Sequence, residues 1–272
     1  MIDHDFALDL PTDLHAALAA LLDPSRPAIP LAGGQSLLVA MKATQTGPER
    51  LVDLSGVREL RGFDVAGERV RIGAMTRHAE LELDPHIRRV VPLLAQAASA
   101  VADPQVRHLG TLGGSLCNAD PAADLPAALV ALRALVHYRD QDGEHVDDVE
   151  TFLNARRAAA RPLLVTAVDV PAHDRLPWAF QKFRPRAMLW AVVGVAYVGG
   201  EVPGIGLAGM GWTTLRAAQA ESALRLGRPY DEVAALADAG SDPLSDATAT
   251  ADYRRHLARV LLRRALAGES TH

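Results

Sequence analysis

The sequence predicts a protein of mixed helices and strands, built in two parts that meet near residues 171–177. Three observations lead to this prediction. Up to Pro171, stretches with apolar residues three or four positions apart alternate with short apolar runs typical of strands. After Pro171 the short apolar runs are interrupted by glycines, as in antiparallel strands. The composition, 49% hydrophobic, 22% charged and only 4% aromatic, is that of a globular chain with an aliphatic core.

The elements of the first part follow from these patterns in order. Leucines at 14, 18, 21 and 22 share one face of a helix that Thr12 or Asp13 caps and that Pro24 and Pro27 end. Later patterns predict a short buried strand at 28–32, a helix at 36–42, a strand at 51–54, a hairpin at 63–73 and a helix at 76–83. They continue with one long helix at 87–101, a glycine-rich segment at 108–115, a helix at 124–133 and strands at 135–139 and 163–170.

The second part is expected to hold antiparallel strands within 178–212, followed by two helices that close the chain. In the last helix the apolar stripe consists of Tyr253, Leu257, Val260 and Leu261. Arginines at 254, 255, 259, 263 and 264 lie mostly outside that stripe, which predicts a face turned to solvent or to another subunit.

Charge and cysteine content exclude several classes of protein. With 28 Lys and Arg against 33 Asp and Glu, the chain lacks the basic excess of a nucleic-acid binder. No apolar run approaches the 18 residues or so of a membrane-spanning helix, and the acidic start, residues 1–5, is not a secretory signal. The single Cys117 can form neither an internal disulfide nor an iron–sulfur cluster, and a cytoplasmic location is expected. The histidines show no metal-ligand spacing, so no metal site is expected.

Two glycine-rich segments are the first candidates for a binding site. They are Ala32-Gly33-Gly34-Gln35-Ser36 and Thr111-Leu112-Gly113-Gly114-Ser115. Glycines allow close backbone approach and expose successive N–H groups, and a helix that starts at Ser36 adds its positive end. Two such loops suit the two phosphates of a dinucleotide, although each Gly-Gly pair is also compatible with a plain tight turn. Neither segment is a Rossmann fingerprint or a P-loop.

Polar residues near these segments are further candidates. Asp124 suits the hydroxyls of a ribityl or ribose chain, or alternatively the N-cap of the helix that begins there. Lys182, Arg184 and Arg186 suit a phosphate or a flavin ring, or alternatively a solvated strand face. No Gly-x-Ser-x-Gly motif is present and no acid, base or nucleophile stands out, so no catalytic residue is predicted.

Four stretches, in order, resemble the FAD-binding (medium) subunit of the molybdenum hydroxylases, of the carbon monoxide dehydrogenase and xanthine dehydrogenase type. The most specific is 106–126, VRHLGTLGGSLCNADPAADLP. The others are 31–38 with Met41-Lys42, 72–76 with Glu80-Leu81, and Ser245-Asp246 followed by 253–257 and 264–266.

The resemblance implies an α+β fold and a set of cofactor contacts. It implies a two-part FAD-binding domain of the vanillyl-alcohol-oxidase type at 1–172, with subdomains at about 1–55 and 56–172, and a smaller α+β C-terminal domain at 173–272. The FAD diphosphate would lie between the two glycine segments, with Asp124 at the ribityl hydroxyls. Ala102 would line the flavin, and Lys182, where the family often has a lysine at the entry to the C-terminal domain, would also bind the cofactor.

The resemblance also implies partners. Electrons would come from a molybdopterin cofactor on a large subunit, through 2Fe-2S clusters on a small subunit, to non-covalently bound FAD and then to an external acceptor. The assembly would be a heterotrimer or a dimer of heterotrimers.

Two departures from the family pattern stand out: Ser115 where the family commonly has Asn, and Trp190 at the acidic position of Lys-x-x-x-Arg-x-x-x-Asp. Two alternatives therefore stay open: a nucleotide-binding regulatory or scaffold protein without redox turnover, and a stand-alone flavin oxidoreductase that uses NAD(P)H.

Overall fold

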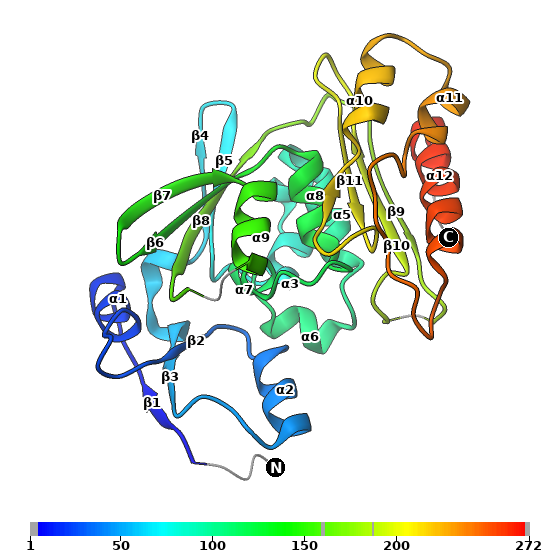
Figure 1. The fold of residues 1–272 in the computed structure, drawn as a ribbon. Coiled ribbons are helices and arrows are strands. Elements are labelled where there is room, and N and C mark those ends of the chain that lie inside the picture. The colour runs from blue at the N-terminus through cyan, green and yellow to red at the C-terminus, as the bar shows by residue number, and fades with distance from the viewer. Residues whose placement is uncertain (1–4, 159–160, 187, 270–272) are drawn as a thin grey trace.

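A computed structural model describes residues 5–158, 161–186 and 188–269, so residues 1–4 of the acidic start and Ala187 lie outside the described part. Three sheets follow one another along the chain, as Figure 1 shows. Helices lie between the second and third sheets and on the outer side of the third.

The N-terminal part is a parallel three-stranded sheet. Its strands, in the order β1-β3-β2, are β1 (Ala7–Asp9), β3 (Arg50–Asp53) and β2 (Ile29–Leu31). The helices are α1 (Leu14–Leu21) and α2 (Leu37–Thr44), with the short turns η1 (Leu54–Gly56) and η2 (Arg58–Leu60) after β3. Asp13 caps α1 by accepting a hydrogen bond from the Ala16 N–H, as expected. The expected buried strand is an edge strand instead, with Ile29 42% exposed.

The middle part is built on an antiparallel sheet of five strands. In sheet order they are β4 (Phe63–Ala66), β5 (Arg69–Gly73), β8 (Leu164–Pro171), β6 (Leu135–Asp140) and β7 (Gly143–Asp148). The hairpin at 63–73 and the strands β6 and β8 are confirmed. Strand β7 and the helix α9 (Val149–Ala158) after it were not predicted, because β7 is polar and half exposed and carries little apolar signal.

A run of short helices fills the middle part. They are α3 (His78–Leu83), α4 (Pro85–Val90), α5 (Pro92–Ser99), α6 (Pro104–Leu109), α7 (Leu112–Asn118) and α8 (Asp124–Ala131). The expected single helix at 87–101 is wrong. Pro92 has no N–H and disfavours helical geometry at Val91, whose φ and ψ are −135° and 56°, so the chain forms two helices. The glycine-rich segment at 108–115 is mostly the end of α6 and the first turn of α7, not an open loop.

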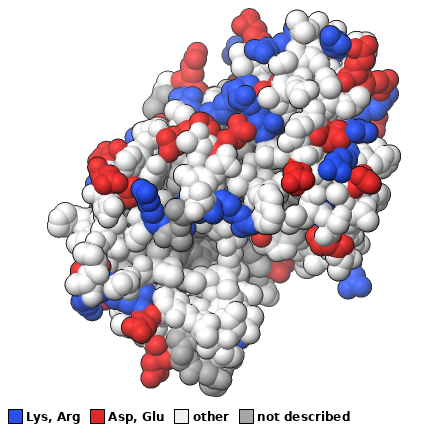
Figure 2. Space-filling view, viewed as in Figure 1, with Lys and Arg blue, Asp and Glu red and all other residues white. Residues whose placement is uncertain are grey.

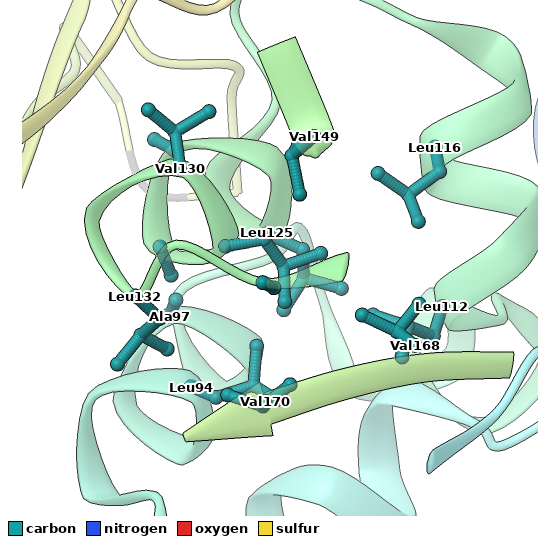
Figure 3. Packing of buried hydrophobic residues seen from close by; sticks show 14 of the residues in the cluster. Leu94, Ala97, Leu112, Leu116, Leu125, Val130, Leu132, Val149, Val168 and Val170 are labelled. Atoms are coloured by element: carbon teal, nitrogen blue, oxygen red, sulfur yellow. The ribbon is translucent and has the colours of Figure 1, made fainter. Parts of the chain in front are cut away.

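Helix α8 lies at the centre of the molecule. All eight of its residues are buried, because α5 packs against it on one side and strands β10 and β11 on the other. A helix that is apolar around its whole circumference is typical of such a central position. Figure 3 shows Leu125 of α8 in the middle of the cluster, with side chains from α5, α7 and β8 around it.

The C-terminal part is an antiparallel four-stranded sheet covered by helices. The strands, β12-β11-β10-β9 in sheet order, are β12 (Leu215–Arg216), β11 (Gly204–Ala208), β10 (Val193–Val198) and β9 (Trp178–Phe183). The antiparallel pairing expected for 191–197 and 205–210 is confirmed. One face of the sheet joins the core around α8, and the other packs on the C-terminal helices, so all six residues of β10 are buried.

Three helices close the described chain, where two were expected: α10 (Ala218–Arg225), α11 (Tyr230–Ala235) and α12 (Ala251–Ala267). The assignment of Arg254 to an exposed face of α12 is wrong. Its guanidinium is buried and bonds the Val192 carbonyl and Asp246, which lies 2.6 Å away. Tyr253, expected in the apolar stripe, is 43% exposed.

The close contact between α8 and β11 depends on glycine. A Cβ added to Gly206 would collide with the carbonyl oxygen of Ala127 and lie 2.9 Å from its carbon. We therefore expect Gly206→Ala to lower the free energy of unfolding by about 1–3 kcal/mol in urea titrations, because the helix must shift. Gly240→Asn is the control, since Gly240 has a φ of 78° and open space around it. Equal stability of the two variants would contradict this packing.

On the face shown in Figure 2, acidic and basic side chains are interspersed and form no continuous patch of one sign. None of the helices in the described ranges combines the length and apolar character needed to cross a membrane.

Candidate functional site

A cavity of about 560 Å³ lies where the three parts of the chain meet. Its size is within the range of small-molecule sites, roughly 300–1,000 Å³. The structure brings all the predicted cofactor-binding residues to its wall: Ala32, Gly33, Gly34, Gln35, Ser36, Ala102, Thr111, Gly113, Gly114, Ser115, Asp124 and Lys182. Residues up to 150 positions apart in the sequence therefore face one space.

The first glycine segment, between β2 and α2, offers backbone donors. Within the described residues, the N–H groups of 33, 34, 35 and 36 donate no hydrogen bond to the protein. Gly34 adopts a φ of 71°, a left-handed conformation that turns successive N–H groups toward a common side. Ser36 is at the N-cap of α2, with no capping bond from its side chain. Four free amides at a helix start form a site for an anion.

The second glycine segment does not offer such donors. The N–H of Leu112 donates to the Thr76 carbonyl (3.0 Å), and that of Gly113 to the Ala74 carbonyl (2.8 Å). The Gly114 N–H donates to the hydroxyl of Thr111, which caps α7. The expectation that both segments present free amides is therefore wrong for 112–114, since the α7 start is already satisfied by the chain.

The first segment packs against Leu109 and Gly110, just before the second segment, and a Cβ added to Gly114 would lie 3.7 Å from the Cβ of Ala32. A Cβ added to Gly33 would collide with the carbonyl oxygen of Leu109 and lie 2.8 Å from the Cα of Gly110. A Cβ on Gly113 would lie 2.7 Å from the Cβ of Ala74. Gly33 therefore allows close packing of backbone against backbone, Gly113 allows close packing against Ala74, and these contacts shape the cavity wall.

Asp124 forms a buried ion pair with Lys182. Oδ2 of Asp124 lies 2.7 Å from Nζ of Lys182, and the two side chains are only 3% and 6% exposed. The other carboxylate oxygen, Oδ1, is buried and has no partner among the described residues. The N-cap alternative is wrong, because Ala123 is the N-cap and Asp124 is the first helical residue. A buried carboxylate oxygen that faces the cavity without a donor is an acceptor that a ligand hydroxyl or amide could use.

Lys182 joins the C-terminal sheet to the middle part. Its Nζ also donates to the Ala100 carbonyl (3.0 Å), which accepts a second bond from Nη1 of Arg184 (3.3 Å). These bonds hold the turn that leads to Ala102, whose φ is 38°. The solvated-face alternative is therefore wrong for Lys182, whereas Arg186 is exposed. Burial raises the pKa of Asp124 to about 6 and lowers that of Lys182, while the attraction between them opposes both shifts.

Sequence reasoning missed several residues of the wall, notably His78 and Arg156, and assigned no role to Cys117 within the stretch 106–126. His78 is buried, its Nε2 lies 3.0 Å from the Thr111 carbonyl, and its Nδ1 has no partner in the described chain. Burial lowers the pKa of His78 to about 4 and raises that of the Cys117 thiol to about 11, so both are neutral near pH 7. Only the three-dimensional structure links His78 and Arg156 to the glycine segments, because their positions in the sequence carry no signal.

The two buried histidines predict a loss of stability in acid. Burial lowers the pKa of His173, as of His78, to about 4, whereas an unfolded histidine titrates near 6.5. Below pH 6.5 the unfolded state takes up the protons first, so the free energy of unfolding falls by about 2 kcal/mol per histidine between pH 7 and 5. Asp124, with its raised pKa, acts in the opposite direction below pH 6. Urea unfolding of His173→Gln at pH 7 and 5 isolates one contribution, and an unchanged pH dependence would refute it.

Three large apolar side chains, Met188, Leu189 and Trp190, line the rim of the cavity. They are about half exposed, Trp190 being 54% exposed. The position where the acidic residue was expected is thus an aromatic side chain at the cavity mouth. Exposed apolar side chains in the same lining as the free amides and the Asp124–Lys182 pair suit a ligand with a planar aromatic part and charged groups.

Comparisons with known proteins place both parts of the chain in known families. Residues 5–173 match the family described as the FAD binding domain in molybdopterin dehydrogenase, and residues 178–268 match the CO dehydrogenase flavoprotein C-terminal domain. The carbon monoxide dehydrogenase medium chain of Afipia carboxidovorans is 33% identical over 98% of this chain and 97% of its own. The caffeine dehydrogenase subunit beta of a Pseudomonas species is 31% identical over 94% of this chain and 92% of its own.

A solved structure agrees as well. Carbon monoxide dehydrogenase from Hydrogenophaga pseudoflava, in a form that lacks the Mo-pyranopterin moiety of its cofactor, has a chain that superposes with a TM-score of 0.88. The identity is 33%, over 98% of both chains. The mixed α/β fold, with an FAD-binding domain followed by a smaller C-terminal domain, is therefore confirmed. The chain belongs to the family of FAD-binding medium subunits of molybdenum hydroxylases.

Proposed function

We propose that this chain holds FAD non-covalently in the cavity described above. The run of four free amides at 33–36 carries this proposal, because it is the anion site that a diphosphate requires. The unpartnered Oδ1 of Asp124 accepts a hydrogen bond from a ribityl hydroxyl. Ala102 and Lys182 line the same space, and Thr111, Gly113, Gly114 and Ser115 give the opposite wall its shape.

The chain contributes position and electrostatics, and FAD, when bound, supplies the redox chemistry. We propose that the chain works beside a large subunit with the molybdopterin cofactor and a small subunit with 2Fe-2S clusters, and that electrons pass from those clusters through this subunit to an external acceptor. The relatives named as medium chain and subunit beta support this assignment. A dimer of heterotrimers and a cytoplasmic location belong to the same proposal.

We also propose the domain division at 1–172 and 173–272, with the first divided near residue 55. The parallel sheet ends at Asp53 and the C-terminal sheet begins at Trp178, which supports both boundaries. The family matches, which end at 173 and begin at 178, support the second.

Flavin retention in the purified chain tests the function. We expect a yellow protein with about one FAD per chain after gentle preparation, and uptake of added FAD by protein that has lost it. A chain that neither retains nor takes up FAD would refute the proposal. Rapid turnover of NAD(P)H with a dye by the isolated chain would favour the stand-alone oxidoreductase. A flavin that stays oxidised in the complete complex during substrate turnover would favour the scaffold protein.

A further inference from the structure

Arg156, in the last turn of α9, brings an unpaired positive charge to the cavity wall. Its Nη1 donates to the Arg161 carbonyl (2.9 Å), which fixes the guanidinium from one side. Its Nε is buried and has no acceptor among the described residues, and none of the ion pairs found there includes Arg156. A guanidinium held in this way has free donors for a ligand.

The charges of the remaining wall make this arginine unusual. Among the described residues that line the cavity, the other side-chain cation is Lys182, and Asp124 already neutralises it at 2.7 Å. Asp124 is the only acidic residue in that lining, and His78 is neutral because burial keeps its pKa near 4. The side chains of the cavity lining therefore carry one net positive charge, that of Arg156. A cofactor with negative groups would compensate it.

Helix α7 connects the surroundings of Arg156 with the free amides at 33–36. Arg156 lines the same cavity as Cys117, which lies in the last turn of α7. The first turn of the same helix approaches the first glycine segment, since a Cβ on Gly114 would lie 3.7 Å from the Cβ of Ala32. Helix α7 thus runs between the amide site and the arginine, and three residues of helix span only about 4.5 Å.

We propose that the guanidinium of Arg156 binds a negatively charged group of FAD. This inference rests on the proposed function and adds a contact that the glycine motifs do not contain. FAD has two groups of this chemistry: the diphosphate, and the N1–C2 carbonyl edge of the flavin, which gains negative charge on reduction. A charge-assisted hydrogen bond to either group stabilises the bound cofactor.

Titration of Arg156→Gln with FAD tests the contact. We expect FAD binding to weaken by about 10- to 100-fold, measured by quenching of flavin fluorescence. Arg156→Lys keeps the charge and should retain more of the affinity, with a steeper loss at high salt than in the wild type. The matched control is Arg157→Gln: this neighbouring arginine does not line the cavity and instead lies over the ring of Trp212, 5.9 Å from its centroid.

Two further ligands distinguish the groups of FAD. If Arg156 binds the diphosphate, Arg156→Gln should weaken ADP and FAD alike. If it binds the flavin edge, ADP binding should stay unchanged. Sulfite, which adds to flavin N5 and leaves negative charge at N1, should then bind more weakly, and the flavin midpoint potential should fall.

Unchanged binding of FAD, ADP and sulfite by a folded Arg156→Gln would overturn the proposal. Circular dichroism establishes that the variant is folded, so that unchanged binding cannot be confused with a failure to fold. Failure of the wild-type chain to bind FAD would refute the proposed function instead, so the two failures are distinguishable.

Discussion

Lys182→Met is expected to lower the free energy of unfolding by about 3–5 kcal/mol at pH 8, because it leaves the carboxylate of Asp124 buried without a counter-ion. In the wild-type protein Nζ of Lys182 is the only donor to that carboxylate among the described residues. Urea titration followed by circular dichroism measures the loss. A variant as stable as the wild type would show that the pair contributes little to stability.

The pH dependence of this loss provides a second signature. Burial raises the pKa of Asp124, and the positive charge of Lys182 lowers it. Removal of that charge should therefore raise the pKa of Asp124 further. A folded-state pKa above the unfolded value means that the folded state takes up the proton first as the pH falls. In the variant, protonation of Asp124 below its folded-state pKa removes the buried charge and restores stability. The difference in free energy of unfolding between Lys182→Met and the wild type should therefore shrink between pH 8 and pH 5.

A double variant separates stability from binding. Replacing both partners with apolar residues, Asp124→Leu with Lys182→Met, removes the unpaired charge and should recover most of the lost stability. Binding of FAD should not recover, because Oδ1 of Asp124 is then absent. Recovery of both properties would indicate that Asp124 has only a structural role.

Gly33→Val is expected to weaken FAD binding by about 100-fold or more. The new side chain meets the backbone of Leu109 and Gly110, which cannot move aside as a flexible side chain does. The two glycine segments must then separate, and the free amides at 33–36 move away from the rest of the wall. Fluorescence titration with FAD measures the effect, and circular dichroism shows whether the fold persists.

A substitution at the adjacent position is the control. Gly34 has a φ of 71°, which Asn tolerates, and a Cβ there meets the side chain of Leu38 rather than backbone. Gly34→Asn should therefore retain FAD within about tenfold of the wild type. Similar losses in both variants would show that the close approach of the two segments is not what matters.

The sequence predicted the elements whose side-chain pattern reports burial. Helix α1 and the strands β6, β8, β10 and β11 have clear apolar periods or apolar runs, and each is present. Strand β7 was missed because its residues are mostly polar, and the break at Val91 was missed because the apolar period continues across Pro92. Arg254 was misplaced because a charged residue becomes buried only through partners from elsewhere, here the Val192 carbonyl and Asp246.

The residues predicted to bind the cofactor all line one cavity, but the bonds between them were not predicted. Glycines and hydroxyls in short segments indicate where a backbone turns, and all of them line one cavity. Which amides stay free depends on Thr76 and Ala74, two carbonyls that no motif includes. The pairing of Asp124 with Lys182 depends on how β9 docks beside α8, a contact between residues 58 positions apart.

The burial of the C-terminal sheet on both faces has a consequence for biogenesis. A chain released before β9, β10 and β11 have docked would leave the flank of α8 uncovered and Asp124 without its lysine. Loading with the dinucleotide should therefore follow completion of the polypeptide, and truncation after residue 172 should yield an insoluble, colourless product rather than a smaller flavoprotein.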